Sequence, residues 1–390
     1  MNLTELSTHS IDYRLVGVSA LELFMETAPS PLVTIETTAD VVELASVVEG
    51  LSFPGLPGWD AMFQSGPRRV LVRSVEAWTT APQTTPQTAH WTDLGGQHPL
   101  MRLSYDPRRR AFADPHHLYE TLQEARSRLG KRRTRKKIDA TDVEPVEVDG
   151  LDAVEAAVLS ARFPLIPRGY PESVPPWTPI PAIPGAWHRL LLEQILTGRF
   201  AWRGLEILSR SGYIVDVLPE LAPMNQTDHS KEGHPEGNVW KHSVETMKYR
   251  KNPEFIVSLA LLLHDAGKPY AEAEGQNRFN RHAELGADLA QRLLQRLDAD
   301  RDTVDEVKWI IRNHMMPGAL ERLPDYRRDP IMESPLFPQL LEVYRCDLSS
   351  TYRGPDGYYR ACHVYRRFLK RNRWVREART ARQLVELYVE

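Results

Sequence analysis

A proline-rich segment divides the chain and limits what each side of it can fold into. Residues 163–184 hold eight of the 30 prolines. Proline fixes its own backbone angle and has no N–H to donate, so this run cannot stay helical and is typical of an extended, semi-rigid linker. We therefore predict a domain boundary here, in a chain whose 390 residues are enough for two or three domains.

The residues after this linker read as helical almost throughout. Apolar residues recur there at spacings of three and four, which is the period of one face of an α-helix. The seven segments with this pattern are 187–196, 204–208, 238–250, 254–266, 282–297, 303–314 and 338–352. Before the linker, short β-branched runs alternate with helical runs and with Pro and Gly breaks, which indicates a small α/β domain. The predicted fold class is therefore mostly α.

Composition excludes several classes of protein. The chain has 49 Lys and Arg against 52 Asp and Glu, a formal net charge of −3 that excludes a globally basic nucleic-acid coat. Its two cysteines, Cys346 and Cys362, cannot form a disulfide framework. No charged leader precedes an apolar run, and no apolar stretch approaches the length of a membrane span. We expect a cytoplasmic protein with no membrane contact.

Two basic segments are candidates for contact with tRNA or other RNA. Eight of the twelve residues at 126–137 are Arg or Lys, and nine basic residues fall in 360–382. Tyr365, Phe368 and Trp374 are interleaved with the second group. Basic side chains attract phosphates, and aromatic rings can stack on bases. The alternative for both segments is an ordinary solvated surface.

Six polar residues lie either directly after an apolar helical segment, as His264 and Asp265 do, or on a predicted helix face shared with apolar neighbours. They are His242, His264, Asp265, His282, His314 and Asp347. Burying such groups without partners is costly, above all for a carboxylate, and a bound metal ion removes that cost. The set predicts one or two divalent metal ions, with Asp265 as the bridge. Its donors accept Mn, Fe, Co, Ni, Zn or Mg. The alternative is that each residue is satisfied separately.

Two metal ions about 3.5–4 Å apart can clamp a phosphoryl group and activate a bound water. The six residues therefore predict hydrolysis of a phosphate ester, with Asp265 and His264 in the catalytic centre. Lys268 would neutralise a phosphate oxygen as a third catalytic residue. Arg278 and Arg281 lie close by in the sequence and are candidates for binding phosphate or substrate.

The run HDAGKP at 264–269 resembles the signature of the HD superfamily of metal-dependent phosphohydrolases. Further segments resemble the helical body of bacterial tRNA nucleotidyltransferase/poly(A) polymerase proteins and the HD domain appended to it. These segments are residues 188–196, 204–212, 217–221, 234–242 and 279–287. The resemblance extends in order over roughly residues 188–352.

The resemblance implies a division of the ligands and a class of substrate. One metal ion would be held by His242, His264, Asp265 and Asp347. Asp265 would bridge to a second ion held by His282 and His314. The related HD domains act on nucleotides and on RNA end phosphates such as 2′,3′-cyclic phosphates, so the same substrates are expected here.

The first third of the chain resembles the nucleotidyltransferase head of the same proteins more weakly. The resemblance rests on residues 14–17 and 105–115. Val18 replaces the family's second glycine, and Thr34 and Glu36 stand where a metal-binding pair of aspartates is expected. One glutamate and a threonine cannot hold two Mg²⁺ ions against a triphosphate. The resemblance therefore implies a degenerate head that no longer adds nucleotides.

The predicted organisation has four parts. A degenerate nucleotidyltransferase-like α/β head occupies 1–137, and an acidic and then proline-rich linker occupies 138–184. An all-helical body with the HD phosphohydrolase domain occupies 185–357, and basic C-terminal helices occupy 358–390. The predicted function is a divalent-metal-dependent phosphohydrolase or phosphodiesterase. Three alternatives stay open: an RNA-binding module with a vestigial HD site, an active tRNA nucleotidyltransferase that adds CCA or A, and a nucleotide-specific HD hydrolase.

Overall fold

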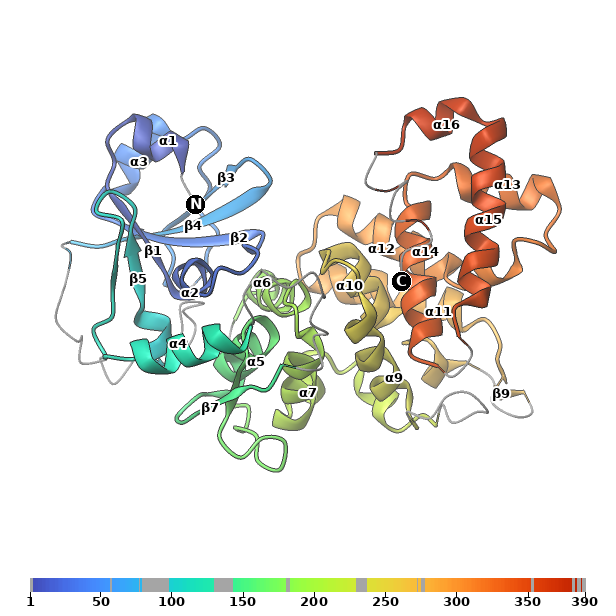
Figure 1. Cartoon of the computed structure of the whole chain (residues 1–390), viewed down its shortest axis with the longest axis horizontal. Coiled ribbons are helices and arrows are strands. Elements are labelled where there is room, and N and C mark those ends of the chain that lie inside the picture. The colour runs from blue at the N-terminus through green and yellow to red at the C-terminus, as the bar shows by residue number, and fades with distance from the viewer. Residues whose placement is uncertain are drawn as a thin grey trace. The chain divides into compact units, whose positions relative to one another are not determined.

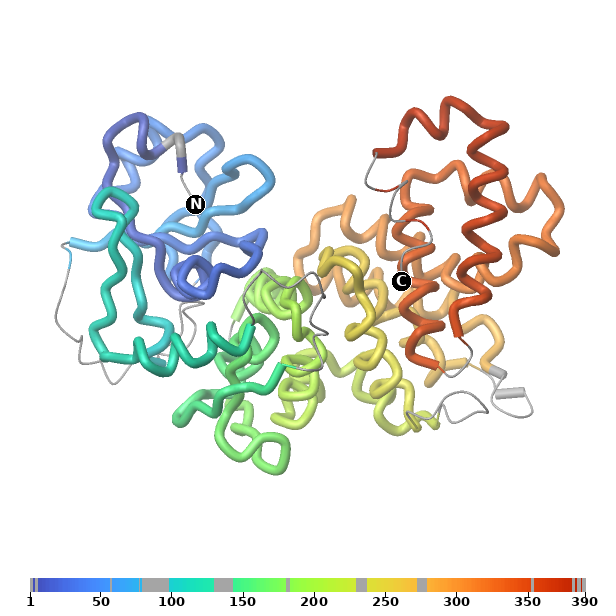
Figure 2. Tube along the Cα trace, viewed as in Figure 1, coloured from blue at the N-terminus to red at the C-terminus, as the bar shows by residue number. Residues whose placement is uncertain are grey.

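The chain forms two compact units, residues 1–212 and residues 213–390, in a computed structural model (Figure 1). The tube in Figure 2 follows the backbone of both units. The structure describes residues 3–56, 58–76, 78, 98–129, 143–179, 183–228, 237–271, 273–274, 278–351, 354–380, 383 and 387.

The first unit begins with a six-stranded sheet in the order β3-β4-β2-β1-β5-β6. Its strands are β1 (Tyr13–Val16), β2 (Leu32–Thr37), β3 (Ala61–Ser65), β4 (Arg68–Ser74), β5 (Ser104–Asp106) and β6 (Ala111–Ala113). Strands β2 and β4 are parallel, and the other neighbours are antiparallel. The near-continuous burial of β2 is expected for a central strand covered on both faces. The predicted α/β head is confirmed.

Four helices accompany the sheet along the head. They are α1 (Thr4–Thr8), α2 (Gly17–Met25), α3 (Val41–Val47) and α4 (Tyr119–Arg128). Helix α2 packs against β1 and β2 and contacts α4. The basic segment predicted at 126–137 lies outside the described residues from 130 onward.

The structure departs from the predicted linker at 138–184. That stretch contains β7 (Val146–Val148), α5 (Ala153–Arg162) and β8 (Leu165–Pro167), with β7 and β8 paired in parallel. Helix α5 is buried along its whole length and starts at a capping box in which Asp152 and Glu155 satisfy each other's backbone N–H groups. Its small and apolar residues place it in the core, a position that the number of prolines in the next segment does not indicate.

Helices α6 (Gly185–Leu196) and α7 (Ala201–Ser211) also belong to the first unit, so the division falls at residue 212 and not at the prolines. Both helices pack against α5. At Gly204 a Cβ atom would lie 2.6 Å from the carbonyl oxygen of Ala157, so only glycine permits this close approach of α7 to α5.

The second unit is helical, as its apolar periodicity predicts. Its helices are α8 (Tyr213–Val217), α9 (Val239–Thr246), α10 (Phe255–Leu263), α11 (His282–Arg296), α12 (Arg301–Asn313), α13 (Asp325–Glu333), α14 (Phe337–Ser349), α15 (Asp356–Arg371) and α16 (Arg373–Glu377). A short hairpin of β9 (Ala273–Glu274) and β10 (Arg278–Phe279) precedes α11. None of the described helices combines the length and apolar character needed to cross a bilayer.

Helix α10 is the centre of this unit. Every residue from Val257 to Leu263 is buried, and the helix contacts α9, α12 and α14. A helix that is apolar on all sides is stable in water only when neighbours surround it. The residues that follow its last turn are therefore carried into the interior.

Candidate metal centre

The six predicted ligands converge in the second unit. His264 ends α10, and Asp265 follows it; both are buried. The other four come from neighbouring helices: His242 on α9, His282 at the start of α11, His314 at the end of α12 and Asp347 on α14. We call these six residues the metal centre.

One half of the metal centre gathers around one oxygen of Asp265. His242 Nε2 lies 3.7 Å and His264 Nε2 lies 3.3 Å from Asp265 Oδ2. Asp347 Oδ1 approaches the same two imidazoles, at 3.0 Å from His242 Nε2 and 4.0 Å from His264 Nε2. Two carboxylates and two imidazoles thus face one point.

The other half gathers around the second oxygen of the same carboxylate. Asp265 Oδ1 lies 3.6 Å from His282 Nε2 and 4.0 Å from His314 Nε2. The two imidazole Nε2 atoms are 3.3 Å apart. Each half has three donor atoms within the span of one ion, and Asp265 belongs to both. The structure thus brings the six predicted residues together around the Asp265 carboxylate.

Hydrogen bonds at the Nδ1 side orient the histidine rings. The Nδ1 atoms of His264, His282 and His314 lie 2.7–2.8 Å from backbone carbonyl oxygens, to which they can only donate. His242 Nδ1 lies 3.4 Å from Ser350 Oγ, whose hydroxyl donates to the Asp347 carbonyl. The rings of His264, His282 and His314 therefore carry a proton on Nδ1 and turn the Nε2 atom inward, as metal-binding histidines do.

The donor set fits a divalent metal ion. His264 Nε2 is a buried acceptor with no hydrogen-bond partner among the described residues. Four imidazole nitrogens and two carboxylates turned toward one another form a concave group that an ion would satisfy. The chemistry accommodates several metals, so it does not fix the metal's identity.

The charges of the metal centre suit metal binding at neutral pH. Burial raises the pKa of Asp265, but the Lys268 ammonium and His264 outweigh it and hold this pKa well below its usual range. Burial opposes ionisation of Asp347 too, yet its hydrogen bond with His242 keeps its pKa low. Burial lowers the pKa of His282 and lowers that of His314 to about 4. Carboxylates are thus ionised and these imidazoles neutral, as metal ligands must be.

The low pKa of His314 predicts how the metal-free protein responds to acid. Between pH 6.5 and about 4 the unfolded chain protonates His314 while the folded chain does not, so stability falls as the pH falls. The free energy of unfolding of chelator-treated protein should drop by ~3 kcal/mol over this window, because a tenfold change in a protonation equilibrium corresponds to about 1.4 kcal/mol. Urea titrations at several pH values measure it. His314→Gln should flatten the dependence, and an unchanged slope in that variant would contradict the assignment.

The predicted phosphate-binding residues do not share one environment. Lys268 is buried and its ammonium donates to Asp265 Oδ2, so it acts on the metal centre itself. Arg281 is exposed and precedes α11 in a left-handed conformation. Arg278 lies in β10, and its side chain is outside the described residues. Ser350, which supports His242, was not predicted; its only sequence signal is a position three residues beyond Asp347.

A close backbone crossing holds the two halves of the metal centre together. A Cβ atom at Gly267 would overlap the His282 carbonyl oxygen and would lie 2.5 Å from the Gly286 nitrogen. The turn after α10 and the first turn of α11 therefore come into close backbone contact at this point. The glycine after His264 and Asp265 is required by this contact.

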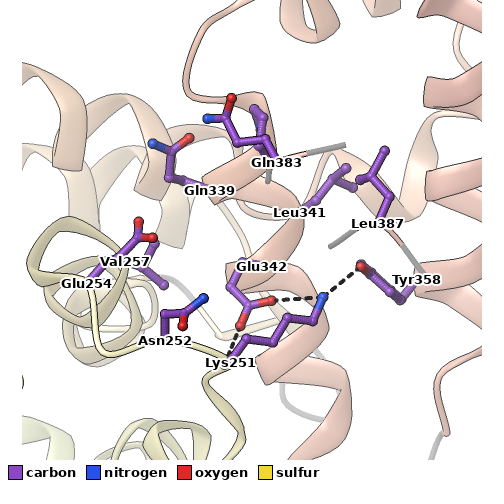
Figure 3. Close-up of a pocket in the computed structure, with 11 residues that line it drawn as sticks. Lys251, Asn252, Glu254, Val257, Gln339, Leu341, Glu342, Tyr358, Gln383 and Leu387 are labelled. Atoms are coloured by element: carbon purple, nitrogen blue, oxygen red, sulfur yellow. Dashed lines mark hydrogen bonds and ion pairs between the residues drawn. The ribbon is translucent and has the colours of Figure 1, made fainter. Parts of the chain in front are cut away.

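A separate pocket in the second unit is lined by none of these ligands (Figure 3). Lys251 Nζ lies there between Tyr358 OH at 3.1 Å and a Glu342 oxygen at 3.5 Å. Glu342 also accepts two hydrogen bonds from the Arg345 guanidinium. Lys251 and Glu342, two of the charged residues that line this pocket, are thus paired with each other, as in a structural network.

The head presents a different group of residues on its central strands. On β2, Thr34 is buried and donates its hydroxyl to the Val16 carbonyl at 2.7 Å. Glu36 is half-buried and forms an ion pair with Arg73, its neighbour on β4, at 3.4 Å. The described part of β2 therefore offers a single carboxylate, and that carboxylate has a cationic partner.

Comparisons with known proteins agree with the geometry of the second unit. Residues 239–343 match the family model of the HD domain. The chain is 32% identical over 160 residues to a multifunctional CCA protein of Halorhodospira halophila, covering 40% of this chain and 39% of that protein. It is 30% identical over 173 residues to a CC-adding tRNA nucleotidyltransferase of Thermus thermophilus, covering 41% and 38%.

A third relative is an A-adding tRNA nucleotidyltransferase of Deinococcus radiodurans, 29% identical over 187 residues, 44% of this chain and 41% of that protein. The chain thus spans about two fifths of the length of the curated relatives it matches. The crystal structure of the Bacillus stearothermophilus CCA-adding enzyme with CTP aligns at a TM-score of 0.45 and 14% identity, over 95% of this chain and 80% of that one.

These relatives correct the predicted enzyme class. They are named for adding nucleotides to tRNA, which is a transferase reaction. The interpretation of the chain as a phosphohydrolase is therefore wrong. The HD domain and the resemblance to tRNA nucleotidyltransferases are confirmed.

Proposed function

We propose that this chain, an HD-domain protein that resembles tRNA nucleotidyltransferases, binds tRNA and adds nucleotides to its 3′ end. The observation that carries the proposal is its identity of 29–32% to CCA-, CC- and A-adding proteins. A nucleotidyltransferase joins a nucleoside triphosphate to an RNA hydroxyl, so both substrates are anionic. This agrees with a protein that carries basic segments despite a net charge of −3.

In this proposal the metal centre holds one or two divalent ions. His242, His264, Asp265 and Asp347 would hold one divalent ion, and His282 and His314 would hold a second together with Asp265. A bound divalent ion supplies positive charge that can orient phosphate groups. Lys268 keeps Asp265 ionised and fixed in position. Arg281, exposed at the start of α11, is free to contact the phosphates of a nucleotide or of an RNA.

The head offers one residue for the transfer itself. A metal-assisted transfer needs a carboxylate near the triphosphate. On the described part of β2 that carboxylate is Glu36, and its partner Arg73 supplies a guanidinium suited to phosphate. In this proposal an incoming nucleotide with its metal ion takes the place of the ion pair.

An observation on the same strand, β2, supports a second candidate function. Thr34 is tied to Val16 and to Ser19, so it cannot serve as a second metal-binding carboxylate. With one carboxylate, the head could retain tRNA binding and have no transfer activity. The chain would then be a tRNA-binding protein that carries an HD domain.

An incorporation assay separates the two functions. Purified protein is given tRNA transcripts that end before the CCA sequence, together with labelled CTP or ATP and divalent metal. We expect incorporation by the native chain and a loss of at least about 100-fold in Glu36→Gln, because the substitution removes the charge that would hold a metal. Glu43→Gln is the matched control, since Glu43 is exposed on α3.

The outcomes differ clearly. Incorporation that survives Glu36→Gln unchanged would assign the transfer to other residues. Tight tRNA binding by the native chain with no incorporation under any metal would establish the second function. Absence of both binding and incorporation would refute the proposal as a whole.

A further inference from the structure

We propose that the exposed face of α15 and α16 binds the phosphate backbone of RNA. The inference rests on the proposed function, because it names the surface through which a tRNA would be held in the second unit. Figure 1 shows the two helices in red, with α16 following α15. None of the ligands of the metal centre belongs to either helix.

Helix α15 divides sharply into two faces. Its inner face is apolar or aromatic and buried, and consists of Tyr358, Ala361, Cys362, Val364, Tyr365, Phe368 and Leu369. Its outer face is exposed and consists of Arg360, His363, Arg366, Arg367, Lys370 and Arg371, with Asp356 at its first turn. Residues three, four and seven apart share a face, so the Arg and Lys side chains of this face form one continuous row.

The row belongs to a segment in which positive charge is concentrated. The segment from 356 to 377 has seven basic and two acidic residues, a net charge of +5, whereas the whole chain has −3. The remaining residues therefore carry −8. A helix that is strongly basic in a chain of net negative charge is a site of attraction for polyanions.

Neighbouring elements do not neutralise the row. Arg360 lies 3.9 Å from Glu321 and Arg371 lies 3.9 Å from Asp325, and all four side chains are more than half exposed. Such surface pairs are weak and are easily exchanged for a phosphate. Within the described part of the chain, Arg367, Lys370 and Arg376 have no carboxylate within ion-pair distance.

Helix α16 adds an exposed aromatic side chain to the basic segment. Trp374 is 61% exposed between Arg373 and Arg376, although most of the chain's large apolar residues are buried. An exposed indole among cations provides a stacking surface for an unpaired base. An acidic protein surface would use the cations but would leave the indole without a partner. RNA uses both.

The dimensions of the row suit a nucleic-acid backbone. Helix α15 has 16 residues and is therefore about 24 Å long. Phosphates follow one another along a strand at intervals of several ångströms, so several can be reached from one helix face. The affinity should then fall steeply with salt, since each phosphate contact releases counterions.

The test measures tRNA affinity of the full chain by fluorescence anisotropy at a series of salt concentrations. The double variant Arg367→Gln/Lys370→Gln removes two cations of the row. We expect the slope of log affinity against log salt to fall by about 1.4–1.8, and the affinity at about 0.1 M salt to fall about 25- to 60-fold. The matched control is Arg301→Gln/Arg322→Gln, which removes two exposed arginines elsewhere in the second unit.

The result distinguishes this surface from the proposed function. If native protein binds tRNA and both double variants show the same slope and affinity, the surface is not the contact, while the proposed function stands. If native protein binds no tRNA, both are refuted. Binding of anionic lipid vesicles in preference to tRNA, lost in the first double variant, would assign the row to a membrane surface and overturn its assignment to RNA.

Discussion

Asp265→Asn should strip the protein of divalent metal, because both halves of the metal centre depend on this one carboxylate. Oδ2 faces His242 and His264, and Oδ1 faces His282 and His314. Asparagine keeps the shape but loses the charge, and it presents an N–H₂ group to one half. The metal content after dialysis should fall to about a tenth of the native value or less, since even indirect partners of metal ligands are worth 10- to 100-fold in affinity.

Asp347→Asn is the comparison that makes this result informative. Asp347 approaches only His242 and His264, so its loss should weaken one half and spare the half at His282 and His314. Elemental analysis by mass spectrometry, together with circular dichroism to verify folding, measures both variants. Equal metal contents in the two variants would show that Asp265 is not a bridge. Native metal content in Asp265→Asn would show that the six residues do not bind metal.

The second large effect is expected from one methyl group. Gly267→Ala places a Cβ atom against the His282 carbonyl oxygen and 2.5 Å from the Gly286 nitrogen, and both are backbone atoms that cannot swing aside. Helix α11 would have to move away from the end of α10 and would take His282 with it. We expect a loss of about 3 kcal/mol in the free energy of unfolding, at the upper end of overpacking costs.

Gly286→Ala supplies the matched control on the opposite side of the same crossing. Its Cβ atom would lie 3.2 Å from the Gly267 nitrogen and 3.5 Å from a methyl group of Ile311, so small adjustments accommodate it. Alanine also favours the helix by up to about 1 kcal/mol over glycine. Denaturant titrations should therefore separate the two variants by more than about 2 kcal/mol. Similar stabilities would show that the crossing tolerates side chains and that Gly267 has another role.

The metal centre could be predicted from the sequence because its signal is local and periodic. The apolar run before His264 and Asp265 predicts a helix that must be buried, and the other histidines fall on faces shared with apolar residues. What could not be predicted is the support behind them. The carbonyl groups that orient the imidazoles, and the contact between Gly267 and Gly286, arise from segments that meet only in three dimensions.

The findings differ from two predictions for physical reasons. The eight prolines at 163–184 favour a linker, whereas the capping box at Asp152 and Glu155 begins helix α5 just before them. The enzyme class failed because imidazoles and carboxylates that hold divalent ions serve hydrolysis and nucleotide transfer equally. A set of metal ligands predicts that a site binds metal. The reaction depends on the substrate and on the other groups that meet at the site.

The ligands of the metal centre are widely spaced along the chain. His242 and Asp347 are 105 residues apart, and the other four fall between them. A bound ion would therefore close large loops of the unfolded chain, as a covalent cross-link does, and would make five separate segments melt together. The second unit would then unfold as one cooperative unit, and its stability would rise with the free metal concentration. The stability of residues 1–212, which contribute no ligand to the centre, would not depend on the metal.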